Sequence, residues 1–236
     1  MLLLAFETSA KAASVALFRD ETLLGECYQN TGLTHSQTLM VMAQDLLKQC
    51  GFAPADVTHT AVAAGPGSFT GVRIGVAAAK GFAWGKEIPC YGVSTLEAMA
   101  TGLGHWNGHI CACMDARRNQ VYNAIFLAKE GILTPVAQDR AIALADLKTE
   151  LARIDGPITL VGDGAALTHR TLTAEIPGLI LPPEHRLHQR AVGVGLVALE
   201  AIARGEEGNA AALAPNYLRL SQAERERLEK ENKGDR

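Results

Sequence analysis

The sequence lacks a surplus of positive charge, a long hydrophobic run and a regular set of paired cysteines. Its formal net charge is −3 over 236 residues, so no bulk attraction to nucleic acid is expected. The apolar run 1–6 stops at Glu7, which is too early for a signal peptide or a membrane span. Five cysteines form an odd-numbered set, which suits a reducing compartment better than a disulfide framework. These absences predict a cytoplasmic protein that does not enter a membrane.

The glycine-rich run 65–71 (Gly-Pro-Gly-Ser-Phe-Thr-Gly) lacks the two familiar phosphate-binding patterns. A P-loop needs Gly-Lys-Ser/Thr, whereas Gly71 is followed by Val72 and Arg73. A dinucleotide turn needs two residues between its second and third glycines, and here there are three. The run joins an apolar strand to a helix, a placement that can bind an anion at free N–H groups. The pattern favours the alternative, a tight turn that lets a crowded helix pack on its sheet.

Two predicted helices, 35–50 and 70–84, carry more apolar surface than the roughly 100° stripe that a surface helix needs. This surplus favours a helix-on-helix contact with another protein over a larger intramolecular core. The sequence does not say which side of the second helix faces outward. The candidate interface residues are Leu39, Met42, Ala43, Leu46, Gly71, Val72, Arg73, Gly75, Val76 and Ala79.

The two halves of the chain share one order of predicted elements. A strand ends on Glu7 in the first half, and another ends on Asp115 in the second. In each half two more strands, a helix, an apolar strand leading into glycines and a further helix follow. This order resembles the architecture of actin, hexokinase and Hsp70. It predicts an α/β fold of two tandem actin-like (ASKHA, ribonuclease H-like) lobes, each a mixed sheet covered by helices. We expect the first lobe over 1–104, the second over 105–220 and a charged tail over 221–236.

The turns after the two strand-terminal acids lack the features of an intact nucleotide site. In the actin-like architecture ATP phosphates lie between these turns, where small residues let the backbone approach. The first turn, 8–12, contains no glycine, and the second carries Arg117 and Arg118. Two carboxylates are also a thin supply of ligands for Mg²⁺. We therefore predict a degraded or rebuilt ATP site, no catalytic residues and no metal site. The candidates for residual cofactor binding are Glu7, Ser9, Gly65, Gly67, Ser68 and Asp115.

Five short motifs spread over essentially the whole chain carry a family resemblance. They are Phe6-Glu7-Thr8-Ser9, Ser14-Val15-Ala16-Leu17, the run 65–75, Asp115-Ala116-Arg117-Arg118 and Pro215-Asn216-Tyr217-Leu218-Arg219. Together they resemble the TsaB (YeaZ) family of bacterial tRNA threonylcarbamoyladenosine (t6A) synthesis. The resemblance implies a non-catalytic, actin-fold paralogue of TsaD that pairs with TsaD through helices of the first lobe. With TsaD and the ATPase TsaE, it would support transfer of threonylcarbamoyl to N6 of adenosine 37 in tRNAs reading ANN codons.

Two departures bear on what the chain does alone. Glu7 stands where the family more often has aspartate, and His35 is followed four residues later by Leu39. The second departure removes the His-x-x-x-His metal pair of the catalytic paralogue. We expect no cofactor on the isolated chain and tRNA contact only through the complex. ATP or ADP at the partner interface and a homodimer of the isolated chain stay open.

Two other classes of function are alternatives. An ATP-dependent small-molecule kinase of the actin/hexokinase fold would need an intact nucleotide cleft. A metallopeptidase would need a metal site or a nucleophile that the sequence does not show.

Overall fold

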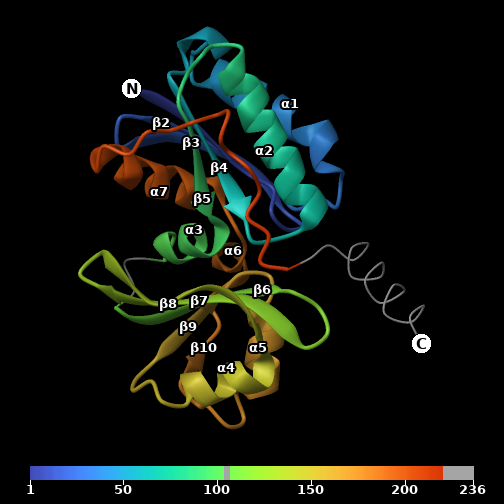
Figure 1. Cartoon of the computed structure of the whole chain (residues 1–236), viewed down its shortest axis with the longest axis vertical. Coiled ribbons are helices and arrows are strands. Elements are labelled where there is room, and N and C mark those ends of the chain that lie inside the picture. Colours follow the sequence, from blue (N-terminus) through green and yellow to red (C-terminus); the bar gives the residue numbers. More distant parts are fainter. Residues whose placement is uncertain (104–106, 220–236) are drawn as a thin grey trace, which may run out of the picture.

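The computed structural model describes residues 1–103 and 107–219, which form two lobes, each with a five-stranded mixed sheet (Figure 1). The first sheet has the order β3-β2-β1-β4-β5 and the second the order β10-β9-β6-β7-β8. Reversed, the second order matches the first strand for strand, so the predicted duplication is confirmed in the topology. The strands are β1 (Leu2–Glu7), β2 (Ala13–Arg19), β3 (Thr22–Gln29), β4 (His59–Gly65), β5 (Cys90–Ser94), β6 (Gly108–Asp115), β7 (Gln120–Lys129), β8 (Ile132–Ala143), β9 (Ile158–Val161) and β10 (Leu179–Ile180).

Two helices cover the outer face of each sheet, as the strand pattern requires. Successive side chains of β1 point to opposite faces of the sheet. Leu4 and Phe6 therefore pack under the first two helices, whereas Leu3 and Ala5 face the other way. The helices are α1 (His35–Gln49), η1 (Pro54–Asp56, a 3-10 turn), α2 (Phe69–Trp84), α3 (Thr95–Thr101), α4 (Leu144–Leu151), α5 (Ala165–Leu172), α6 (Glu184–Leu187) and α7 (Ala191–Ala203).

The inner face of each sheet is covered by a helix from the other half of the chain. Helix α7 packs on β1, β2 and β4 of the first sheet, and α3 packs on β6 and β7 of the second. The two helices also contact each other between the lobes (Figure 1). At their crossing, a Cβ on Gly193 would lie 2.0 Å from the carbonyl oxygen of Ala98. Only glycine therefore permits this approach of the two backbones.

The structure differs from the predicted lobe boundary at residue 220. The chain leaves the second lobe before α7 and returns to the first, so 105–220 is not one unit. The repeat in the sequence correctly predicts the order of the elements, but it does not specify which sheet the last helix covers. Within the described residues, the second lobe spans 107–190. The predicted tail over 221–236 lies outside the described residues.

Candidate functional site

A cleft of about 550 Å³ opens where the two predicted turns face each other between the lobes. On the first-lobe side it is lined by the turn after β1 and by the start of α2. On the second-lobe side it is lined by the turn after β6, with Tyr122 and Asp163. Because β1 and β6 occupy equivalent places in the two sheets, the duplication itself brings their ends together. This cleft is the position predicted for a nucleotide site.

The six predicted cofactor-binding residues do not all lie in the cleft. Ser9, Gly67, Ser68 and Asp115 line it. The remaining two, Glu7 and Gly65, do not: Glu7 is buried behind the turn, and Gly65 lines a different pocket beside β5.

The glycines of the run 65–71 serve close packing of the first turn on α2. A Cβ on Gly67 would lie 2.5 Å from the carbonyl oxygen of Ser9, and one on Gly71 would lie 2.1 Å from that of Thr8. Two hydrogen bonds fasten the same contact: Ser68 N donates to Ser9 O at 2.7 Å, and Thr8 Oγ1 donates to Gly71 O at 2.8 Å. These contacts support the packing alternative for the run.

Glu7 is an internal acid that closes the first turn. Its side chain is 1 % exposed, and Oε1 accepts a hydrogen bond of 2.5 Å from the backbone N–H of Ser9. Burial raises the pKa of Glu7 to about 7, the nearby charge of Asp163 acts in the same direction, and the Ser9 hydrogen bonds oppose them. A carboxyl group held in this way is out of reach of a ligand in the cleft.

The second turn is open and strained. Arg117, Arg118 and Asn119 have φ values of 62°, 56° and 57°, a left-handed conformation that costs non-glycine residues roughly 1 kcal/mol each. The Arg117 N–H donates to Asp115 Oδ1 at 2.7 Å, which holds the turn in place. Arg117 lines the cleft, as predicted for both arginines, whereas Arg118 lines a separate pocket beside α4.

Asp163 is a cleft residue that the sequence prediction missed. Burial raises the pKa of Asp163, and hydrogen bonds from the Asp115 backbone and the Gln189 side chain partly oppose this effect. The available signal was Gly162-Asp163-Gly164, because it follows β9 as the glycine run follows β4. Among residues 1–103 and 107–219, no group of three or more His, Cys, Asp or Glu side chains is arranged to hold a metal ion.

Nine of the ten predicted interface residues lie in the core of the first lobe, and Arg73 is the exposed exception. The nine were expected to face a partner because they are apolar or small. The same properties suit the face of each helix that packs on its own sheet. The outward faces carry other residues, among which Met40, Val41 and Trp84 are large, apolar and 43 %, 56 % and 70 % exposed.

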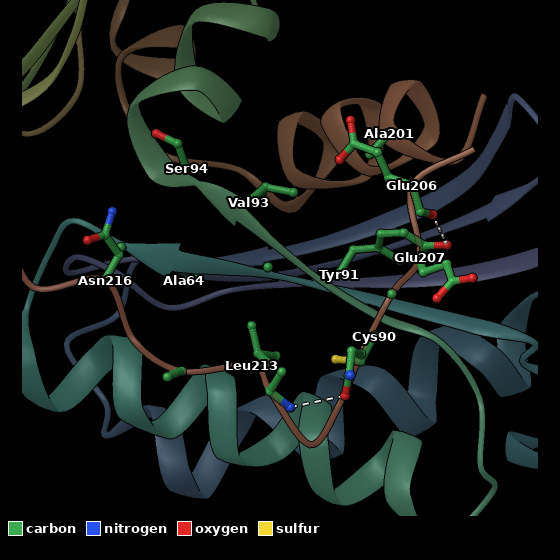
Figure 2. A pocket seen from close by; sticks show the side chains of 16 residues that line it. Ala64, Cys90, Tyr91, Val93, Ser94, Ala201, Glu206, Glu207, Leu213 and Asn216 are labelled. Carbon is green, nitrogen blue, oxygen red and sulfur yellow. Dashed lines mark hydrogen bonds between the residues drawn. The ribbon is translucent and has the colours of Figure 1, made fainter. Parts of the chain in front are cut away.

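A second pocket, of about 440 Å³, lies between β5 and the segment that returns after α7 (Figure 2). Tyr91 and Val93 of β5 lie on one side, and Leu213 and Asn216 of the returning segment lie on the other (Figure 2). Asn216 N donates to Ala64 O at 2.6 Å. A Cβ on Gly65, whose φ is 117°, would lie 2.4 Å from Asn216 O. The absence of a side chain at Gly65 therefore lets the C-terminal segment pack against the end of β4.

Comparisons with known proteins agree with this architecture. A family model described as TsaD, tRNA N6-adenosine threonylcarbamoyltransferase, matches residues 29–226. The tRNA threonylcarbamoyladenosine biosynthesis protein TsaB of Bacillus subtilis is 35% identical over 231 residues, which cover 97% of this chain and 99% of that protein. TsaB of Escherichia coli is 36% identical over 167 residues, or 70% of this chain and 72% of that protein.

Solved structures extend the comparison to the fold. YeaZ from Pseudomonas aeruginosa has a TM-score of 0.75 at 28% identity, covering 92% of this chain and 100% of that one. Component A of (R)-2-hydroxyglutaryl-CoA dehydratase from Acidaminococcus fermentans has a TM-score of 0.51 at 12% identity over 86% of this chain and 99% of that one. The second likeness concerns the fold alone, and with the first it confirms the predicted actin-like fold class. None of the described helices is long and apolar enough to cross a bilayer. Because the matches run through both lobes and both turns, this chain belongs to the TsaB (YeaZ) family.

Proposed function

We propose that this chain is a non-catalytic subunit of t6A synthesis. In this role it supports a TsaD-type protein that transfers threonylcarbamoyl to N6 of adenosine 37 in tRNAs reading ANN codons. Family membership supports the pathway. The observation that carries the non-catalytic role is Glu7, because this strand-terminal acid is buried and hydrogen-bonded to Ser9 N behind the cleft. The kinase and metallopeptidase alternatives are not favoured by the same matches.

The partner surface that we propose is the outward face of α1 and α2. Met40 and Val41 of α1 and Trp84 of α2 are exposed on these helices, and large exposed apolar side chains are typical of protein contacts. Ala77 and Gly81, also exposed on α2, are small enough to let another helix approach closely. Two such helices meeting two from a paralogue would bury on the order of 1,600 Å². The same face could pair with a second copy of the chain, since a two-fold contact is self-complementary.

For ligands, we propose that the isolated chain binds no nucleotide tightly and contacts tRNA only within the complex. Two N–H groups beside the cleft, those of Ser9 in the first turn and Ser68 in the glycine run, already donate to protein oxygens. ATP or ADP at the partner interface would lie in the cleft lined by Ser9, Ser68 and Asp115. The ATPase TsaE would complete the assembly in the cytoplasm.

Reconstitution tests this function. We would measure t6A formation on a tRNA that reads ANN codons, with the TsaD-type protein, TsaE and this chain present or left out one at a time. Omission of this chain should abolish product, and the purified chain should show no turnover of Mg-ATP by itself. ATP turnover by the chain alone that disappears in Asp115→Ala would instead support the kinase alternative.

The partner face has its own test. Val41→Glu and Trp84→Glu place charge on exposed positions, so both variants should melt like the wild type while losing association with the TsaD-type protein. Val76→Glu is the matched control, because Val76 is 5 % exposed and a charge there should unfold the lobe. Wild-type affinity in both exposed variants would place the contact elsewhere.

A further inference from the structure

The C-terminal segment fixes one side chain of the proposed partner face. The ring of Tyr217 stacks on that of Phe69 at the start of α2, with centroids 4.0 Å apart and planes 6° apart. The guanidinium of Arg73, one turn further along α2, lies 4.5 Å from the Phe69 centroid and 5.6 Å from that of Tyr217. Arg73 Nε donates a hydrogen bond of 2.7 Å to the Tyr217 hydroxyl.

The segment that carries Tyr217 is held on both sides of this contact. Before it, Lys80 Nζ donates to Leu213 O at 2.8 Å and Asn216 N donates to Ala64 O. After it, Arg219 Nη1 donates to Ala116 O of the second lobe at 2.7 Å. Figure 1 shows the segment running from α7 past α2 to the place where the lobes meet. Tyr217 therefore has a fixed position from which to hold Arg73.

Arg73 keeps hydrogen-bonding capacity in this arrangement. Its Nε is used by Tyr217, but neither terminal NH₂ group has a hydrogen bond or ion pair to another residue in the described parts of the chain. The side chain is exposed on the same helix face as Ala77 and Trp84. A planar guanidinium with two free NH₂ groups takes a carboxylate in two parallel hydrogen bonds. Because stacking already fixes the side chain, little further rotamer entropy is lost on binding.

We propose that Tyr217 is a positioning residue for association, which holds Arg73 so that its NH₂ groups meet a carboxylate of the TsaD-type partner. This proposal rests on the proposed function. The ligand is a protein carboxylate, because the exposed strip of α2 on which Arg73 lies carries only small or apolar residues beyond it, Ala77, Gly81 and Trp84, and no second charge. The chain as a whole also carries a net charge of −3, which does not attract RNA. The C-terminal segment is therefore part of the association surface.

The test compares affinity for the TsaD-type protein of the same organism, measured by titration calorimetry, with the melting temperature of each variant. Tyr217→Ala should weaken binding about tenfold, the loss expected when a strong interface contact is removed. Tyr217→Phe keeps the stack but loses the hydroxyl, so its effect should be smaller. Arg73→Gln should match Tyr217→Ala, and its affinity should depend less on salt. The double variant should be no weaker than Arg73→Gln, because both changes act through one guanidinium.

Two controls and four contrary outcomes complete the experiment. Tyr91→Phe removes a hydroxyl that bonds to the carbonyl of Glu206 in the same returning segment, and Arg204→Gln removes an exposed arginine elsewhere; neither should change affinity. A lower melting temperature in Tyr217→Ala with unchanged affinity would overturn the proposal, as would additive losses in the double variant. Weaker tRNA retention by the assembled complex, with protein–protein affinity unchanged, would place Arg73 on RNA and also overturn it. A wild-type chain that fails to bind the TsaD-type protein would overturn the proposed function itself, which is a distinguishable result.

Discussion

The two lobes share one strand order, yet the acids at their equivalent strand ends lie in different surroundings. Glu7 is 1 % exposed with a pKa raised to about 7, whereas Asp115 is exposed at the cleft. The first turn lies directly on α2, a helix of 16 residues, whereas the second turn uses three left-handed residues and stands open. The two halves therefore share one strand order, but only in the first half is the turn part of the packed interior.

The glycines after β4 and β9 are, by contrast, a feature that the two lobes share, because each lobe needs glycine at the same place. After β9, a Cβ on Gly162 would lie 2.2 Å from Cys113 O, and one on Gly164 would lie 2.8 Å from the carbonyl carbon of Met114. Gly67 and Gly71 make the same kind of approach to the turn after β1. Glycine is required at these places because the chain passes over the end of the central strand, too close for a side chain to fit between the two backbones.

The largest expected effect on stability comes from replacing the glycines that allow this close backbone approach in each lobe. Gly71→Ala and Gly164→Ala should each lower the free energy of unfolding by about 4 kcal/mol or more, because the added methyl group meets backbone that cannot move aside. Urea unfolding measures the loss. Gly81→Ala, where a Cβ would meet no atom within 4 Å, is the control and should gain up to about 1 kcal/mol from helix propensity. Tolerance of either change at Gly71 or Gly164 would refute the topological account for that lobe.

A smaller effect sharpens the contrast between the two acids. The pKa of Glu7 is raised from 4.5 to about 7 in the fold, so the folded state keeps a proton that the unfolded chain loses between these values. Stability should therefore fall as the pH rises through this window and level off above it. The loss is about 3 kcal/mol at most. Chemical denaturation from pH 5 to pH 8 measures it.

Glu7→Gln should reduce this pH slope, leaving the part that Asp163 contributes because burial also raises its pKa. The variant should be more stable than the wild type at pH 8, because the amide oxygen can still accept from Ser9 N. Asp115→Asn, the matched change at the exposed acid, should leave the slope in place. An unchanged slope in Glu7→Gln would show that another group titrates.

The smallest effect concerns the turns themselves. Arg118→Gly should gain somewhat under 1 kcal/mol, because glycine adopts the left-handed conformation at φ 56° without the steric cost that arginine bears. Lys11→Gly, at an exposed residue of the first turn that is not left-handed, should lose stability instead. The melting temperatures of the two variants test this prediction. A higher melting temperature in both would mean that the backbone strain is not confined to the second turn.

The sequence predicted the order of the strands better than it predicted which helix faces are exposed. The strand order and the match of Glu7 with Asp115 followed from elements that repeat in order, a pattern that one sequence displays. The face of α2 did not follow, because Val72 and Val76 are apolar whether they meet a partner or the helix's own sheet. The motif around Tyr217 was visible, but its contact with Arg73 joins positions 144 residues apart, and nothing local in the sequence specifies such a contact.

The exchange of α3 and α7 between the sheets has a consequence for synthesis on the ribosome. The face of the first sheet formed by Leu3, Ala5 and Phe18 is covered by α7, which ends at Ala203. A nascent chain that has released only its first half therefore exposes an apolar face that no segment yet made can cover, although N-terminal domains usually fold first. Both lobes must consequently mature together, late in translation, with α7 as the element that completes the earliest strands.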